Sequence, residues 1–388
     1  MPHKTPISPN HQPLSAFYFF FFAALGVFIP YWPPYLKSLD FSAVEIGELM
    51  AIVMASKIIA PYLLGWLSDH FQRRLIIIQG SLLITVIAFS GVFIYQSFWW
   101  YALVMTVFGF FWNASLPIFE ALTMDQLKGN MSGYSTIRLW GSIGFIISVT
   151  ILPLIIMNET DIMLLPYIVL GLLILNGISS LFVKDRTNKI RTDDLSGILE
   201  TIKKPVIMAL LIACALQSLS HGAYYTFFSI YLEDHGYSRK FTGMMWALGV
   251  LAEVILFLIV MAKQHLFKQL GVYRLFSFAL FITSIRWFVL ALWVDNLTLL
   301  LISQLLHAAS FGLFHLAAIS LTHQLFPDHL KGRGQALYAG ISFGLGGTLG
   351  TLLSGYTWDG MGATWTFLAS ALIALLGAII AAKYVTAK

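Results

Sequence analysis

Eight ionisable side chains lie within long apolar runs of this 388-residue sequence, where such groups are uncommon. A charged group near the middle of a membrane helix costs about 2.5–3.5 kcal/mol on insertion scales, so it usually faces a cavity or a partner. The eight are Lys57, Glu120, Arg138, His221, Glu253, Arg286, His307 and His315. The cations can hold an anion, and the carboxylates and imidazoles can carry a proton. We therefore expect binding and proton transfer, with no catalytic residues.

The cations and carboxylates divide into predicted substrate and proton groups. A guanidinium stays charged and can hold a carboxylate by two parallel bonds, so Arg286 is expected to bind an anionic substrate or Glu253. Glu120 and Arg138 lie near the cytoplasmic ends of two successive apolar runs, so they either bind substrate or reach to the interface. Glu253 lies in the middle of its run and is expected to carry the proton.

The three histidines can titrate near neutral pH. We assign His221 to substrate binding and His307 and His315 to proton coupling; the alternative is a hydrogen-bonded core histidine. His307 and His315 are eight residues apart and share one broad helix face, but no third ligand at helical spacing accompanies them, so no metal is expected. Weaker candidates, which could line a cavity or bridge helices, are Asn113, Gln217 and Gln304.

The elements that must position these residues are membrane helices. Hydrophobic residues make up 58% of the chain and charged residues 11%, where a soluble domain has about a quarter charged. Runs of about 20 apolar residues, enough to cross a bilayer as a helix, occur twelve times. They lie near 15–36, 43–66, 75–95, 98–122, 137–157, 162–183, 206–232, 241–262, 271–293, 298–322, 335–356 and 362–383. The predicted fold is an all-α polytopic membrane protein.

The distribution of Lys and Arg predicts orientation. With the N-terminus in the cytoplasm, 17 of the 23 fall on inside loops and tails and three on outside loops. This bias predicts a multi-pass protein of the bacterial cytoplasmic membrane with both termini inside. The modest net charge of +5 forms no clustered basic stripe, so no nucleic-acid partner is expected.

The two halves of the sequence resemble each other at a constant offset of 196 residues. The longest polar stretch divides the spans six and six, so we predict bundles at 1–183 and 206–388 joined by a cytoplasmic loop at 184–205. The offset pairs Tyr35-Leu36, Phe41-Ser42, Gly47 and Gly26 with Tyr231-Leu232, Tyr237-Ser238, Gly243 and Gly222. It also pairs Lys57 with Glu253, which a pseudo-twofold axis would place across a central cavity. We assign Lys57 to substrate binding; the alternative is a fixed ion pair locking the halves.

The loop after the second span, Gly65 to Arg74, carries a carboxylate and two arginines between short-linked helices. Such groups can bridge helix ends and break apart when the halves rock; the alternative is an ordinary basic turn. The loop resembles the major facilitator superfamily signature Gly-x-x-x-Asp-(Arg/Lys)-x-Gly-Arg-(Arg/Lys). Gly65, Asp69, Arg73 and Arg74 match it and are predicted to gate conformation, whereas His70 and Gln72 depart from it.

Within that superfamily, nearly the whole chain resembles the phenylpropionic acid permeases, relatives of lactose permease. The segments that carry the resemblance are Ile29-Pro30-Tyr31-Trp32, 137–142, 221–225, 248–254, Ile285-Arg286-Trp287, Leu306-His307 and 315–318. The resemblance implies twelve helices in two pseudo-twofold bundles and import of a small aromatic carboxylate such as 3-phenylpropionate.

Similarity to lactose permease implies roles for the charged pairs. The Glu120–Arg138 and Glu253–Arg286 spacings resemble its sugar-binding and coupling charges, and His307 falls near its coupling histidine. The carboxylate one turn after that histidine is replaced here by Ser310. Proton release is then expected to use Glu253, a histidine or a different arrangement.

The expected function is a proton-coupled symporter, with the proton as coupling ion, no cofactor and no obligate protein partner. The alternatives are a sugar or nucleoside symporter and, less fitting to a charged cavity, a drug–proton antiporter. A membrane sensor would need a soluble signalling domain, for which the central loop leaves no room. An enzyme is disfavoured because the sequence has no nucleophile–base arrangement or phosphate loop. Its single cysteine, Cys214, permits neither an internal disulfide nor a cysteine metal site.

Overall fold

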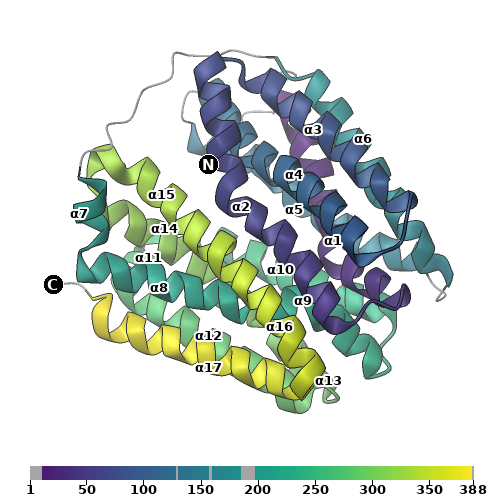
Figure 1. The fold of residues 1–388 in the computed structure, drawn as a ribbon. Helices are drawn as coiled ribbons and strands as arrows, with labels where there is room; N and C mark the ends of the chain where they lie inside the picture. The colour runs from purple at the N-terminus through teal and green to yellow at the C-terminus, as the bar shows by residue number, and fades with distance from the viewer. Residues whose placement is uncertain (1–10, 128–129, 157–159, 185–196, 387–388) are drawn as a thin grey trace. The chain divides into compact units, whose positions relative to one another are not determined.

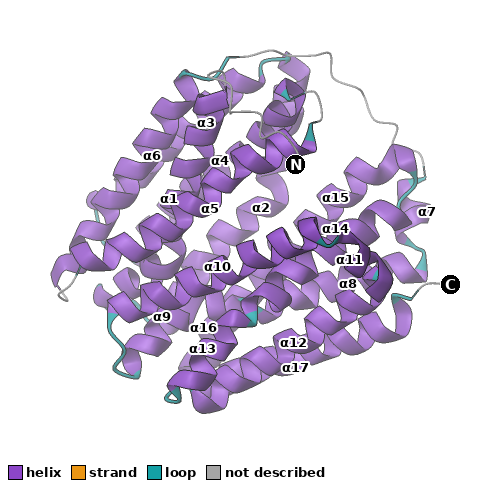
Figure 2. Cartoon of the chain, turned by 180° about the vertical axis from the view of Figure 1, so that it is seen from behind, coloured by secondary structure: helices purple, strands orange, loops and turns teal. Residues whose placement is uncertain are grey.

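A computed structural model describes residues 11–127, 130–156, 160–184 and 197–386, and every regular element in these ranges is helical (Figures 1 and 2). Twelve helical segments are long and apolar enough to cross a membrane, which confirms the predicted fold class. In the first half of the chain they are α1 (Gln12–Ser38), α2 (Ala43–Phe71), α3 (Arg74–Ser90) continued by η2 (Gly91–Phe93), α4 (Phe98–Gln126), α5 (Met131–Ile155) and η3 (Thr160–Leu164) with α6 (Leu165–Leu181).

The second half contains six further spans, several of them interrupted. They are α8 (Pro205–Ser220) with α9 (Gly222–Asp234), α10 (Arg239–Ala262), α12 (Val272–Trp293), α13 (Leu297–Leu305) with η4 (Ala308–Leu313) and α14 (Phe314–Leu325), η5 (Asp328–Leu330) with α15 (Lys331–Ala339), η6 (Gly340–Gly346) and α16 (Gly347–Met361), and α17 (Ala363–Tyr384). The short helices α7 (Ile198–Ile202) and α11 (Gln264–Leu270) lie outside the spans. Both η4 and η6 are π-helical, a geometry frequent at functional sites.

The described residues fall into two compact units. The first takes those of 1–39 and 59–190, and the second those of 40–58 and 191–388. The first part of α2 thus belongs with the second unit. Most of the predicted central loop, 185–196, lies outside the described residues, so the predicted bundle and linker boundaries stay a prediction.

Small residues bring the first part of α2 against α16 within the second unit. A Cβ on Gly47 would lie 2.8 Å from the Cα of Gly355, closer than side-chain contacts allow. One residue further along each helix, the Tyr356 hydroxyl donates to Oε1 of Glu48 at 2.6 Å. Two glycines and one polar pair therefore join these helices.

The 196-residue repeat has counterparts in the structure. Ser42 caps the start of α2 by accepting from the Glu45 N–H at 3.2 Å, and its equivalent Ser238 caps α10 by accepting from the Phe241 N–H at 3.2 Å. Gly26 of α1 packs on the backbone of α5, and its equivalent Gly222 of α9 packs on the backbone of α16. Equivalent serines thus cap helices, and equivalent glycines contact a neighbouring backbone, in both halves of the chain.

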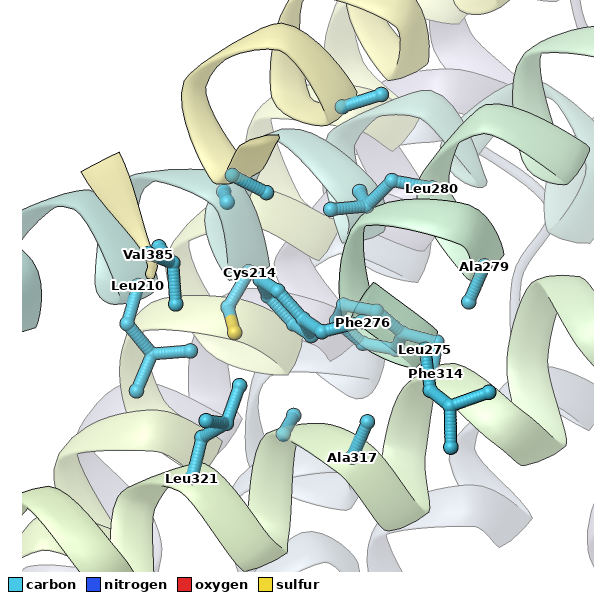
Figure 3. Packing of buried hydrophobic residues seen from close by; sticks show 14 of the residues in the cluster. Leu210, Cys214, Leu275, Phe276, Ala279, Leu280, Phe314, Ala317, Leu321 and Val385 are labelled. Carbon is cyan, nitrogen blue, oxygen red and sulfur yellow. The ribbon is translucent and has the colours of Figure 1, made fainter. Parts of the chain in front are cut away.

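The core of the second unit is built from large and very small side chains together (Figure 3). Leu210 and Cys214 of α8, Phe276 of α12 and Phe314 of α14 are at most 1% exposed. Alanines fill the remaining places, at Ala209, Ala213, Ala279, Ala317, Ala318, Ala378 and Ala381. Because lipid is as apolar as these side chains, close packing rather than water exclusion stabilises the contacts.

Candidate functional site

Arg286 is the centre of a polar group inside the second unit. Its side chain on α12 is fully buried. Nε donates to the Ser303 carbonyl at 2.8 Å, Nη2 to Oε1 of Gln304 at 3.3 Å, and Nη1 to Oγ of Ser310 at 3.2 Å. Nη1 also lies 3.0 Å from Nδ1 of His307. The guanidinium lies over the rings of Tyr224 and Trp287, at 4.3 and 4.5 Å from their centroids.

No carboxylate of the described residues pairs with Arg286. A buried cation is costly unless paired, and here neutral acceptors and aromatic faces compensate it. Four hydrogen bonds engage a group with five N–H donors, so a bidentate carboxylate bond requires at least one of them to break. Arg286 is a buried cation that an anionic ligand would neutralise.

The Arg286–His307 contact determines the tautomer of His307. An arginine only donates, so Nδ1 of His307 must accept, and in the neutral ring the hydrogen is on Nε2. That Nε2 lies 3.7 Å from Oε2 of Glu253. The sequence-predicted residues Arg286, His307 and Glu253 therefore form a row in which the imidazole separates the cation from the carboxylate.

Small residues and a π-helix make room for this row. A Cβ on Gly312 would lie 3.0 Å from Cγ of Glu253, and one on Gly249 would lie 3.4 Å from the His307 ring. His307 immediately precedes η4, and Ser310 lies within it. The wider turn of a π-helix shifts the register of the side chains that follow it.

His315 belongs to a different contact from His307. Its Nδ1 lies 2.9 Å from the Tyr338 hydroxyl. The Phe311 ring lies between the two histidines, nearly parallel to both, with centroid distances of 5.3 Å to His307 and 6.0 Å to His315. The shared face predicted for the two histidines is thus occupied by an apolar ring between them.

His221 lies at the break between α8 and α9. Its Nδ1 contacts the Gln217 carbonyl at 2.8 Å, and its ring meets that of Trp287 at 4.8 Å. Gln217 in turn donates to Oγ1 of Thr283 at 2.9 Å and to the Ser310 carbonyl. These contacts place His221 in the same part of the second unit as Arg286.

Glu120 and Arg138 come together within the first unit. Oε1 of Glu120 lies 3.6 Å from Nε of Arg138 and accepts from the Tyr134 hydroxyl at 3.3 Å. The Arg138 guanidinium lies 3.9 Å from the centroid of Phe22. The two charged side chains are 35% and 32% exposed, so Arg138, unlike Arg286, remains reachable from outside the protein.

Lys57 lies on α2 and is partly buried. It makes no hydrogen bond or ion pair with any residue that the structure describes, and Glu253 instead lies against His307. The ion pair considered from their matched positions is therefore not among the described contacts. Its amine is a second intramembrane cation available to an anion.

In the loop after α2, one arginine makes the predicted bridge. Arg74 pairs with Asp69 at 3.3 Å and with Asp125 of α4. The Arg73 side chain makes no such contact with a described residue, and nothing lies within 4 Å of a Cβ placed on Gly65. Gln72 has a φ of 51°, in the left-handed region that favours glycine. The signature has glycine at this position, so glutamine here strains the backbone of the turn.

Sequence reasoning named His307 and, as a weaker candidate, Gln304, but it missed Ser303, Ser310 and Tyr224 as partners of Arg286. One apolar run carries a polar stripe at spacings of one, three and three residues that could have revealed the two serines; it consists of Ser303, Gln304, His307 and Ser310. Tyr224 and Tyr134 gave no such signal. The assigned roles of the predicted site residues stay predictions. Within the described ranges no three His, Cys, Asp or Glu side chains gather as metal ligands would.

Comparisons with known proteins place this fold in a family. The model of the MFS_1 like family matches residues 11–369. The "Probable 3-phenylpropionic acid transporter" of Escherichia coli (strain K12) is 26% identical, over 92% of this chain and 94% of that protein. The "Putative nucleoside transporter YegT" of the same strain is 24% identical, over 91% and 88%.

Solved structures share the fold at lower identity. The nucleoside transporter NupG superposes with a TM-score of 0.82 at 15% identity, covering 98% of this chain and all of that one. The xylose transporter XylE of E. coli, in an inward open conformation, superposes with a TM-score of 0.75 at 12% identity, covering 96% and 95%. The chain is a multi-pass membrane protein that belongs to the MFS_1 like family, a secondary transporter of the major facilitator type.

Proposed function

We propose that this protein is a proton-coupled symporter that imports a small aromatic carboxylate such as 3-phenylpropionate. The observation that carries the proposal is the fully buried Arg286, which has no carboxylate partner among the described residues. An anionic substrate would supply the missing negative charge. The relative named as a probable 3-phenylpropionic acid transporter supports this substrate class.

The balance of charges in the second unit favours an anion. Lys57 and Arg286 are intramembrane cations, and Glu253 is the matching carboxylate, held beside His307. Aromatic rings of Tyr224 and Trp287 line the guanidinium and would also pack on a phenyl ring. Arg138 with Glu120 is the accessible charged pair of the first unit and the other candidate carboxylate ligand.

Glu253 and His307 are the proposed proton carriers. While His307 accepts from Arg286 it cannot also be an imidazolium, because both nitrogens would then donate. A proton arriving at this row therefore goes to Glu253, or it goes to His307 with loss of the Arg286 contact. The second route would free a donor of Arg286 for the substrate and would link protonation to substrate binding.

A sugar or nucleoside symporter is the second candidate. It is favoured by the likeness to NupG and to a "Maltose permease" of Geobacillus stearothermophilus, which is 22% identical over 95% of this chain and 93% of that protein. Such substrates are neutral and would bring no negative charge to Arg286. We also propose that the protein lies in the bacterial cytoplasmic membrane with both termini in the cytoplasm. Its two helix bundles are proposed to comprise residues 1–183 and 206–388.

The test is a substrate panel in proteoliposomes containing the purified protein, with an inward proton gradient. Labelled 3-phenylpropionate should accumulate, and its uncharged amide, 3-phenylpropionamide, should not compete. Accumulation of a nucleoside or a sugar in place of the acid would refute the aromatic carboxylate. Equal competition by the amide would refute the role of Arg286 as anion ligand.

A further inference from the structure

Two buried hydrogen-bond acceptors at the end of α8 have no donor among the described residues. They are Oε1 of Gln217 and Nε2 of His221. Both residues are 2% exposed, and their spacing of four places them on one face of the helix. Buried polar groups are almost always hydrogen-bonded, so two unmatched acceptors one turn apart indicate a place for a donor.

The orientation of both groups follows from their other contacts. The Gln217 amide nitrogen faces the Ser310 carbonyl, which can only accept, so the amide oxygen is the atom left over. Nδ1 of His221 faces the Gln217 carbonyl, which likewise only accepts, so Nδ1 carries the hydrogen. In the neutral ring Nε2 is then a bare acceptor.

The two acceptors lie where α8 meets α12 and η4. Gln217 contacts Thr283 of α12 and Ser310 of η4. The His221 ring contacts the ring of Trp287, one turn after Thr283, and the ring of Phe311, the residue after Ser310. Arg286, on the same stretch of α12, bonds to the same Ser310. The acceptors and the buried cation therefore belong to one site.

Three neighbouring donors, on Trp287, Tyr224 and Thr283, are engaged elsewhere. The Trp287 indole N–H donates to Oγ of Ser220 at 3.3 Å, and the Tyr224 hydroxyl donates to Oε1 of Gln304 at 2.9 Å. The Thr283 hydroxyl donates to the Ala279 carbonyl at 2.9 Å or to that of Ser310 at 3.3 Å. Satisfying Gln217 and His221 from these groups would leave another acceptor unmatched.

We propose that Gln217 and His221 form a subsite that recognises a hydroxyl group of the substrate, so that the transported acid is a hydroxylated aromatic acid. The inference rests on the proposed function. The adjacent Arg286 disfavours a cationic donor, which leaves a neutral one. Rings of Trp287, Tyr225 and Phe311 surround His221, an environment that accepts a phenol.

The experiment compares inhibition constants in the proteoliposome uptake assay. Unlabelled 3-phenylpropionate and its 2-, 3- and 4-hydroxyphenyl analogues compete with labelled 3-phenylpropionate. One hydroxy isomer should compete about tenfold better than the parent acid, the worth of one well-made buried hydrogen bond. In His221→Phe and in Gln217→Leu this ratio should fall to about one, and His221→Asn, which keeps an amide acceptor, should restore part of it.

His235→Phe is the matched control. His235 makes the same contact as His221, from Nδ1 to the carbonyl four residues earlier at 2.8 Å, but it follows α9 and is exposed. This variant should keep the wild-type ratio. Melting temperatures of the purified variants report folding. The ratio of inhibition constants is compared only among variants that retain the wild-type melting temperature. If His221→Phe misfolds, His221→Asn provides the test instead.

Three outcomes decide the proposal. Equal competition by all four acids in the wild type would overturn it, and so would a hydroxyl preference that survives both His221→Phe and Gln217→Leu. If the acids fail and a nucleoside competes instead, the proposed function fails. The hydroxyl subsite then stands only if the preference for the nucleoside over its deoxy analogue disappears in His221→Phe.

Discussion

Nη1 of Arg286 lies 3.0 Å from Nδ1 of His307, whose other ring nitrogen lies 3.7 Å from Glu253. A cation that only donates, an imidazole and a carboxylate thus form one buried row. Because the middle ring cannot accept from Arg286 and be doubly protonated at once, a proton and the Arg286 contact compete for His307. This competition links the proton to the residue that is proposed to hold the substrate.

Removing the proton site at Glu253 should uncouple transport. Glu253→Gln keeps the size of the side chain but cannot ionise, so accumulation against a gradient should be lost while exchange of internal for external 3-phenylpropionate continues. Uphill uptake and counterflow in the same vesicles measure the two activities. Glu200→Gln, at an exposed side chain of α7, should change neither. Accumulation by Glu253→Gln at the wild-type level would exclude the residue from coupling.

Replacing Arg286 by lysine should impair transport although the charge is kept. An ammonium cannot reproduce the fork that reaches Ser303, Gln304 and His307 together. With hydrogen bonds to charged groups worth about 1.5–3 kcal/mol each, a loss of one or two predicts about a hundredfold lower uptake efficiency. Arg274→Lys, on an exposed side chain of the same helix, serves as the control. Near-normal uptake by Arg286→Lys would mean that charge alone suffices.

Lys57 should be needed for binding but not for folding. It makes no ion pair with a described residue, so Lys57→Met removes a desolvated charge without orphaning a partner. The melting temperature should stay the same or rise, and the KM for the carboxylate should rise about tenfold through lost charge attraction. A lower melting temperature with an unchanged KM would assign Lys57 a structural role instead.

The two arginines after α2 should differ in effect. Arg74 bridges Asp69 and Asp125, whereas the Arg73 side chain makes no ion pair within the described part of the chain. Arg74→Gln should cost about 1 kcal/mol of stability and slow turnover severalfold, and Arg73→Gln should cost much less. Thermal unfolding and initial uptake rates compare them directly. If the two variants had equal effects, the ion pairs of Arg74 would not be the contribution that the signature residues make.

Gly222 should tolerate no side chain. A Cβ there would overlap the backbone of Gly350, so Gly222→Ala must push α9 away from α16, at about 1–3 kcal/mol. Gly171→Ala in α6 is the matched change, since nothing lies within 4 Å of its Cβ and alanine favours the helix. The first variant should melt several degrees lower and the second no lower than wild type. Similar melting temperatures would contradict the close packing.

The spans were predictable from the sequence because bilayer thickness dictates helix length, and all twelve occur. The 196-residue offset between Gly26 and Gly222 was also visible in the sequence, and both glycines lie against a neighbouring backbone. The π-helices η4 and η6 were not predictable, because an extra residue per turn does not change the mean hydropathy of the run that contains it. Neither was the membership of 40–58 in the second unit, which depends on contacts with residues some 300 positions away.

The site was predictable in its charged members but not in how they pair. Arg286, Glu253 and His307 stand out by charge in apolar runs, yet their order, with the imidazole in the middle, depends on the relative rotation of three helices. Lys57 and Glu253 are matched in sequence, but that match did not yield an ion pair among the described residues. Neutral partners such as Ser303 do not stand out in the sequence, although Arg286 donates a hydrogen bond to the Ser303 carbonyl.

The most direct test of proton-coupled carboxylate import is external pH in lightly buffered, de-energised cells that express the protein, with Glu253→Gln as control. Adding 3-phenylpropionate or cinnamate should raise the external pH in cells with the wild-type protein, because protons enter with the acid. A β-galactoside or a nucleoside should have no effect. An acid that crosses the membrane unaided would give the same signal in the control. No alkalinisation beyond that of Glu253→Gln, or a response to the sugar or nucleoside alone, would contradict the account.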